Sequence, residues 1–163
     1  MNVFVLLAAA LIPLVIGFVW YHPKVFGTAW MKATGITPES GKGMNMALVF
    51  GLTYLFSFFL AFAMCSLSIH QFHVMSLFFK QPIDDPNTEA GALFKNIMDH
   101  YGNSYRTFRH GAFHGIIGGI VLALPIVAIN AMFERKGFKY IAINTGYFIV
   151  CFALMAGVVC AFA

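Results

Sequence analysis

Charged side chains are scarce in this sequence and fall in three short stretches. Only 10% of its 163 residues are Asp, Glu, Lys or Arg, while 60% are hydrophobic and the mean hydropathy is +0.80. No charge occurs in residues 1–23, 43–79, 110–133 or 140–163. Each window exceeds the roughly 20 apolar residues that a helix needs to cross a bilayer. The composition therefore excludes a compact soluble domain and a disordered chain, and it predicts a membrane protein.

Features that would identify several other classes of protein are also missing. The net charge of +4 is not gathered into a basic run that could follow phosphates, so we expect no nucleic-acid partner. The three cysteines, Cys65, Cys151 and Cys160, lack CxxC spacing and indicate neither a zinc cage nor a disulfide framework. Motifs such as GxSxG, a phosphate loop or HExxH are absent, so we expect no enzymatic activity.

The four charge-free windows predict an all-α integral membrane four-helix bundle that forms a single domain over residues 1–163. We expect helices at about 2–21, 45–79, 110–133 and 140–163, with an extramembrane segment at 80–109. The second helix is longer than one bilayer, so it should project from the membrane or bend near His70 and Gln71.

The segment 80–109 contains the pattern of an additional interfacial amphipathic helix at about 86–101. Its apolar residues recur at helical spacing: Leu93, Phe94, Ile97, Met98 and Tyr101. Asp85-Pro86 resembles a helix start, with proline at the first helical position, and Gly102 resembles a stop. Such a helix can lie on the membrane, cover a partner or simply cap the bundle.

Small residues recur every four positions in the last two predicted helices. They are Gly111, Gly115 and Gly119 in one helix, and Ala153, Gly157 and Ala161 in the other. Such stripes let helices approach closely in lipid. They favour a structural or accessory subunit that packs in a homo-oligomer or against other membrane proteins.

Basic residues predict the orientation of the four crossings. The first and third connections hold six Lys or Arg in 25 positions, against four in the 30 positions of the second. The positive-inside rule then places the first and third connections in the cytoplasm. We therefore expect a multi-pass protein of the plasma (inner) membrane, with both termini and residues 80–109 outside the cytoplasm.

Four histidines lie beside predicted membrane boundaries at one face of the bundle. His70 and His73 are one turn apart near the end of the second helix, and His110 and His114 are one turn apart at the start of the third. Imidazole is a common ligand of metals and of haem iron. The alternative function is therefore a redox or metal-binding module that holds haem, copper or zinc. The other interpretation is that these rings only occupy the headgroup layer.

A third, weaker alternative is an oligomeric transporter of ions or small solutes. None of the apolar windows contains a carboxylate or a basic side chain, whereas ionisable groups within the membrane are the usual mark of such pathways. The polar residues Asp99, His100, Arg106 and Arg109 belong to the outer segment, where they could pair with the histidines.

The stretch from Gly17 to Met31 carries an aromatic motif. The residues that match WY-x-P-x-x-F-G-x-x-W are Trp20, Tyr21, Pro23, Phe26, Gly27 and Trp30. This pattern resembles the N-terminal signature of the bacterial membrane family catalogued as domain of unknown function 1761, and residues 130–147 are similar to its C-terminal half. The resemblance implies the four-helix plan and no particular activity. Physically, Pro23 ends the first helix, and the aromatic rings after it favour an interfacial anchor or a site for lipid or a partner.

Overall fold

The computed structural model describes the backbone of residues 1–163 and every side chain except that of Pro38. The described residues form helices and loops, and none of them lies in a strand. Four helical stretches are long and apolar enough to cross a membrane, and these spans are Val3–Trp20, Met46–Ser68, Phe108–Phe133 and Phe138–Phe162. The predicted all-α bundle with four spans is therefore confirmed.

Within and between the spans, the chain forms shorter helices and turns. In order they are α1 (Val3–Ala9), α2 (Ile12–Trp20), the π-helical turn η1 (Pro23–Gly27), α3 (Thr28–Thr34), the 3-10 turn η2 (Pro38–Gly41), α4 (Met46–Ser68), α5 (His70–Leu77), α6 (Glu89–Tyr101), α7 (Phe108–Gly118), the π-helical turn η3 (Gly119–Ala123), α8 (Leu124–Phe133) and α9 (Phe138–Phe162).

Two of the spans are interrupted beside a proline. Pro13 lies in the first turn of α2, directly after the break that separates α1 from α2. Pro125 lies in the first turn of α8, directly after the wide turn η3. Proline has no backbone N–H, and its ring collides with the carbonyl group four residues earlier, which explains both interruptions.

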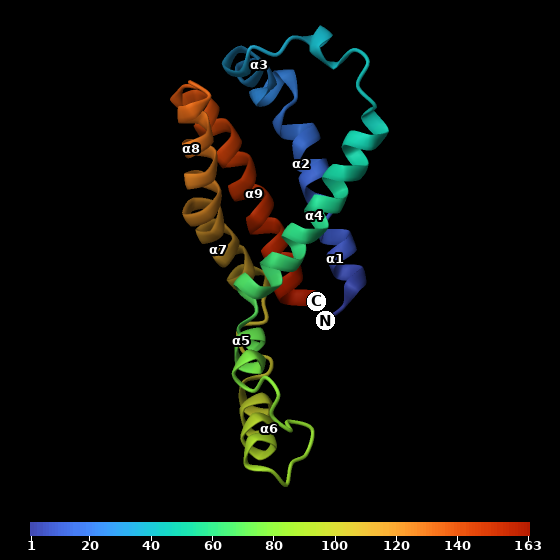
Figure 1. Cartoon of the computed structure of the whole chain (residues 1–163), viewed down its shortest axis with the longest axis vertical. Coiled ribbons are helices and arrows are strands. Elements are labelled where there is room, and N and C mark those ends of the chain that lie inside the picture. Colours follow the sequence, from blue (N-terminus) through green and yellow to red (C-terminus); the bar gives the residue numbers. More distant parts are fainter.

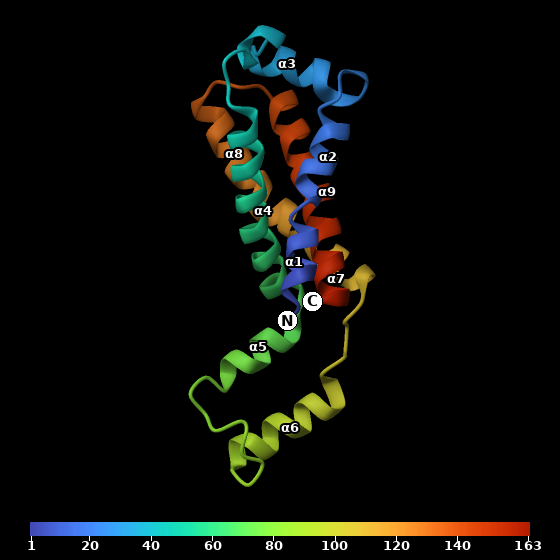
Figure 2. The ribbon, with the colours of Figure 1, turned by 90° about the vertical axis from the view of Figure 1, so that its right-hand side faces the viewer.

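The last helix, α9, lies at the centre of the bundle (Figure 1). It contacts α1, α2, α4, α7 and α8, and its side chains supply much of the buried core, including Cys151, Met155 and Val159. Both termini lie at one end, and α3 crosses the opposite end (Figure 2). The segment of α5 and α6 extends beyond the termini, so it lies on their side of the bundle, as four crossings require.

The helix predicted over residues 45–79 is two helices, because the chain breaks at Ile69. Ile69 has an extended backbone (φ −104°, ψ 100°), and its side chain is only 2% exposed. Burial of this side chain in the bundle holds the break in place, and α5 leaves at an angle to α4. The bend therefore precedes the predicted position by one residue.

The helix in the projecting segment starts at Glu89, so the predicted start at Asp85-Pro86 is wrong. The side chain of Thr88 accepts a hydrogen bond from the Gly91 N–H and caps α6. Asp85 instead accepts from the backbone N–H of Asn87 in the preceding turn. The predicted stop at Gly102 is the residue that caps the C-terminus of α6.

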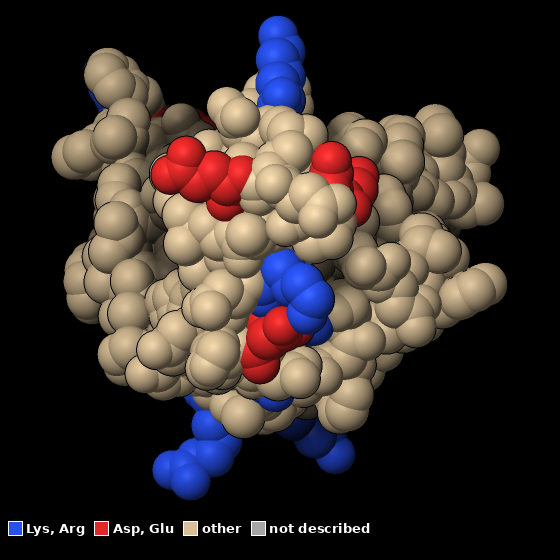
Figure 3. All heavy atoms as spheres, turned by 90° about the horizontal axis from the view of Figure 1, so that it is seen from below, with Lys and Arg blue, Asp and Glu red and all other residues tan. Residues whose placement is uncertain are grey.

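The apolar face of α6 packs on α5 over only part of its width. The rings of Phe78 and Phe94 lie 5.5 Å apart, and Ile97 and Met98 are half-buried. Leu93 and Tyr101, from the same predicted face, remain exposed. Viewed from below, acidic and basic side chains are interspersed over this end of the molecule (Figure 3).

Candidate functional site

Three of the four predicted histidines converge where α5 leaves the bundle. His70 is the first residue of α5, and His110 and His114 lie one turn apart on α7. The Nε2 atoms of His70 and His110 are 3.0 Å apart. One ring nitrogen from each of the three residues can be chosen so that all three atoms lie within 4.8 Å of one another. The break at Ile69 creates this arrangement, because it turns His70 toward α7.

His73, the fourth predicted histidine, is not part of this cluster. Its Nε2 atom lies 2.9 Å from the carbonyl oxygen of Ser66, so its ring packs back against the end of α4. Two of the polar residues expected as partners for the histidines are also engaged elsewhere. Asp99 pairs with Lys95, and the Arg106 guanidinium donates to the carbonyl oxygen of Ala163.

Tyr105 is a further member of the site that the sequence did not indicate, and its ring lies beside the histidine cluster. Its ring centroid is 5.1 Å from that of His110 and 5.9 Å from that of His70. Its backbone has a positive φ of 63°, which is uncommon for a bulky side chain and costs free energy. No sequence pattern marks this position, since the conformation depends on the loop between α6 and α7.

The predicted glycine stripe of α7 lies against α9. A Cβ atom added at Gly111 or Gly115 would overlap a backbone carbonyl oxygen of α9, and one added at Gly119 would meet Ile149 at 2.6 Å. On α9, the residues facing these glycines are Ile149, Phe152, Ala156 and Cys160. The predicted stripe on α9 lies to one side of this face: Gly157 lies against the Phe108 ring, and Ala153 and Ala161 are half-buried.

The aromatic motif joins α2 to α9. The indole N–H of Trp20 donates to the Ile143 carbonyl at 3.0 Å, and the Tyr21 hydroxyl donates to Asn144 Oδ1 at 3.0 Å. These bonds tie the end of the first span to the start of the last.

The rest of the motif turns the chain across the bundle and covers these two rings. Pro23 opens the turn η1, and Gly27 closes it against the Tyr21 carbonyl. Phe26 then packs on Trp20 with ring centroids 4.6 Å apart, and Trp30 packs on Tyr21 at 5.2 Å. The motif is thus chiefly a tertiary contact, and less a free interfacial anchor than the sequence suggested.

We expect Tyr21→Phe to lower the free energy of unfolding by about 1 kcal/mol, because it removes the hydrogen bond to Asn144. Burial raises the pKa of the Tyr21 phenol above its ordinary value. Its contribution to stability is therefore complete below about pH 10 and is lost as the pH rises further. Unfolding in mixed micelles between about pH 8 and pH 11 should show a smaller alkaline loss for the variant than for the unmodified protein.

Tyr101→Phe is the matched control for this substitution, because Tyr101 is 64% exposed. It should leave both the stability and its pH dependence unchanged. Equal alkaline losses in Tyr21→Phe and the unmodified protein would contradict the assignment of Tyr21 as a buried donor.

Comparison with known proteins identifies the family but offers no function. No curated protein and no solved structure matches this chain. The family model described as "Protein of unknown function (DUF1761)" matches residues 4–160, which include the motif, the glycine stripe and the histidine cluster. The chain therefore belongs to this family.

Proposed function

We propose that this protein is a membrane metal-binding protein that holds a zinc or copper ion between His70, His110 and His114. The observation that carries the proposal is that three imidazole nitrogens lie within 4.8 Å of one another although His70 and His110 are 40 residues apart in sequence. Imidazole suits both ions, and three histidines leave a further coordination position open to water or a substrate.

The spacing of the rings supports a single ion. With Zn–N bonds of 2.0–2.1 Å in tetrahedral geometry, ligand nitrogens lie about 3.3 Å apart. The Nε2 atoms of His70 and His110 are 3.0 Å apart, so a small rotation of one ring would accommodate the ion. The site contains no carboxylate, so the ion's positive charge would remain uncompensated by the protein.

Haem fits this cluster less well than a single ion. A haem with two axial histidines lies between their rings. The His110 and His114 rings pack directly on each other, with centroids 4.5 Å apart, and leave no space for a porphyrin between them. The cavity beside His70 measures about 230 Å³, below the 300–1,000 Å³ typical of sites for small organic ligands.

The role of a structural or accessory subunit stays a prediction. The glycines that suggested it are buried between α7 and α9 of the same chain, so they present no free surface to another protein. The orientation also belongs to the proposal. The distribution of Lys and Arg supports placing the termini and the histidine cluster outside the cytoplasm of a plasma membrane.

Metal titration of the purified, detergent-solubilised protein tests the proposal. We expect one equivalent of Zn²⁺ or Cu²⁺ to bind by calorimetry. At a free-ion concentration 100 times the Kd, the free energy of unfolding should rise by about 2.7 kcal/mol. His110→Ala should weaken binding by more than about 100-fold, because loss of a direct ligand exceeds the 10–100-fold effect of an outer partner.

His73→Ala provides the matched control, because His73 lies one turn from His70 but outside the cluster. It should bind the ion like the unmodified protein. The proposal is wrong if the unmodified protein binds neither ion stoichiometrically, or if His110→Ala and His73→Ala bind equally.

A further inference from the structure

A cavity of about 650 Å³ lies between α2, α4 and α9. Its wall uses the first half of α4, whereas the histidine cluster lies beyond the other end of that helix. The aromatic motif builds part of its wall, through Tyr21, Pro23 and Trp30. Its volume falls in the range of 300–1,000 Å³ that is typical of sites for small organic molecules. The motif thus borders a partly open space that is large enough for a ligand.

The wall of this cavity offers almost no polar group to a ligand. The Tyr147 hydroxyl donates to the Pro13 carbonyl at 2.8 Å, and the Tyr21 hydroxyl is bound to Asn144. Thr53 also donates its hydroxyl proton within its own helix. Because these groups already have partners, the interior favours an apolar chain and disfavours a polar solute.

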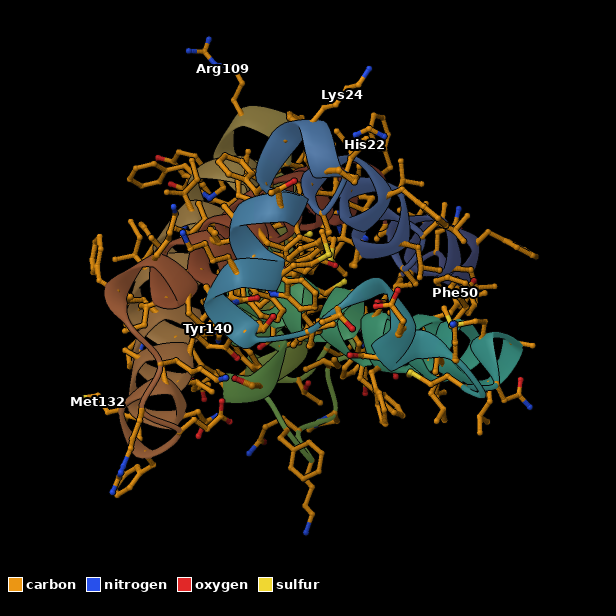
Figure 4. The ribbon with its side chains drawn as sticks, turned by 90° about the horizontal axis from the view of Figure 1, so that it is seen from above. His22, Lys24, Phe50, Arg109, Met132 and Tyr140 are labelled. Carbon is orange, nitrogen blue, oxygen red and sulfur yellow. The ribbon has the colours of Figure 1, made fainter. Side chains whose placement is uncertain are left out.

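The side of the cavity formed by α2 and α4 faces the surroundings of the bundle. The rings of Phe18 and Phe50 lie at this side with centroids 5.8 Å apart, and they are 69% and 40% exposed. Figure 4 shows Phe50 between the N-terminal helices and α4. Both residues belong to membrane spans, so the material next to them is the acyl region of the bilayer.

The edge of the cavity at His22 carries a hydrogen-bond donor, and a positive charge lies next to it in the chain. His22 lies on the cavity wall, and its Nδ1 atom accepts the backbone N–H of Lys24 at 3.2 Å. A neutral ring in this arrangement carries its proton on Nε2, which can donate to a ligand. The Lys24 side chain is exposed and points away from the bundle at the same edge (Figure 4).

We propose that the cavity binds a phospholipid, with one acyl chain between α2 and α4 and its phosphate at His22 and Lys24. The apolar wall matches the chain, and the exposed pair Phe18 and Phe50 marks its entry from the bilayer. The His22 ring at the edge of the cavity, with the flexible Lys24 side chain two residues further on, matches the phosphate. This site is separate from the histidine cluster, so a test of lipid binding here does not depend on whether the cluster binds a metal ion.

The chain has two tryptophans, Trp20 and Trp30, and both belong to the motif. Trp30 lines the cavity and therefore reports on this site. Bromine atoms on an acyl chain quench indole fluorescence on close contact. We expect phosphatidylglycerol with a dibrominated acyl chain to quench the full-length protein saturably in detergent micelles. Val49→Phe, which adds bulk to the cavity wall, should weaken this binding by about tenfold.

Leu52→Phe controls for the added ring, because Leu52 lies on the same helix but outside the cavity wall. It should quench like the unmodified protein. Lys24→Ala should weaken binding of the lipid by about fivefold, because Lys24 adjoins the lining residue His22. Lys32→Ala, further along the chain on α3, should not.

A brominated alkane without a headgroup distinguishes a phospholipid from a free apolar molecule, and it should bind more weakly than the phospholipid. The proposal is overturned if quenching by the lipid does not saturate, or if Val49→Phe and Leu52→Phe quench alike. Equal affinity for the alkane and the lipid, with no effect of Lys24→Ala, would equally overturn it.

Discussion

Gly115→Ala is expected to lower the free energy of unfolding by roughly 3 kcal/mol or more, because α7 can no longer pack on α9. The added Cβ would overlap the carbonyl oxygen of Phe152 in α9, and a backbone group cannot move aside as a side chain can. The helices would have to separate, and separation would open the contacts of Gly111 and Gly119 at the same time. Unfolding in mixed micelles, followed by circular dichroism, measures the loss.

The matched control is Gly51→Ala, since nothing lies within 4 Å of a Cβ added at Gly51 in α4. Alanine is the better helix former by about 1 kcal/mol, so this variant should be as stable as the unmodified protein or more stable. If Gly115→Ala and Gly51→Ala unfold alike, the close approach of α7 to α9 is not what holds the bundle together.

Gly27→Ala is the second substitution with a large expected effect, because it disrupts the turn that carries the aromatic motif. Its Cβ would overlap the carbonyl oxygen of Tyr21 and come within 2.8 Å of the carbonyl carbon of His22. The turn η1 cannot then close, and α3 cannot lie across the bundle. The Trp30 ring then loses its contact with Tyr21 and becomes more exposed, so we expect the tryptophan emission to shift to longer wavelength. The free energy of unfolding should fall by roughly 2 kcal/mol.

Gly41→Ala tests whether the effect belongs to this turn, because a Cβ at Gly41 has no neighbour within 4 Å. Gly41 lies in the same connection between the first and second spans, and its substitution should change neither the emission nor the stability. An unshifted emission spectrum of Gly27→Ala would show that the motif folds without the close contact at this position.

The spans were predictable because the bilayer imposes a simple rule on length and charge. Windows without charge became helices, apart from the breaks beside Pro13, before Pro125 and at Ile69. The excess length of the second window predicted either a projection or a bend near His70 and Gln71, but the choice between them and the exact position at Ile69 depend on a buried contact in the folded bundle. The start of α6 was misplaced for a local reason, because the Thr88 side chain caps the helix while Asp85 and Pro86 lie in the preceding turn.

The sequence predicted that four histidines lie at one face of the bundle, but it did not indicate which of them converge. One turn separates His70 from His73, yet the break at Ile69 directs the first toward α7 and leaves the second on the Ser66 carbonyl. The cavity also could not be predicted from the sequence, because its wall combines residues from three spans. Only the aromatic motif gave a signal there, and its apparent role was anchoring to the interface.

The hydrogen bonds of Trp20 and Tyr21 join residues that are 123 positions apart. The first span can pack on α4 earlier, but these two hydrogen bonds cannot form until the last span has entered the membrane. The hairpin of the third and fourth spans, joined by a short loop, can form on its own from neighbouring residues. Assembly should thus end at the aromatic motif, which is completed last, when the whole chain is in place.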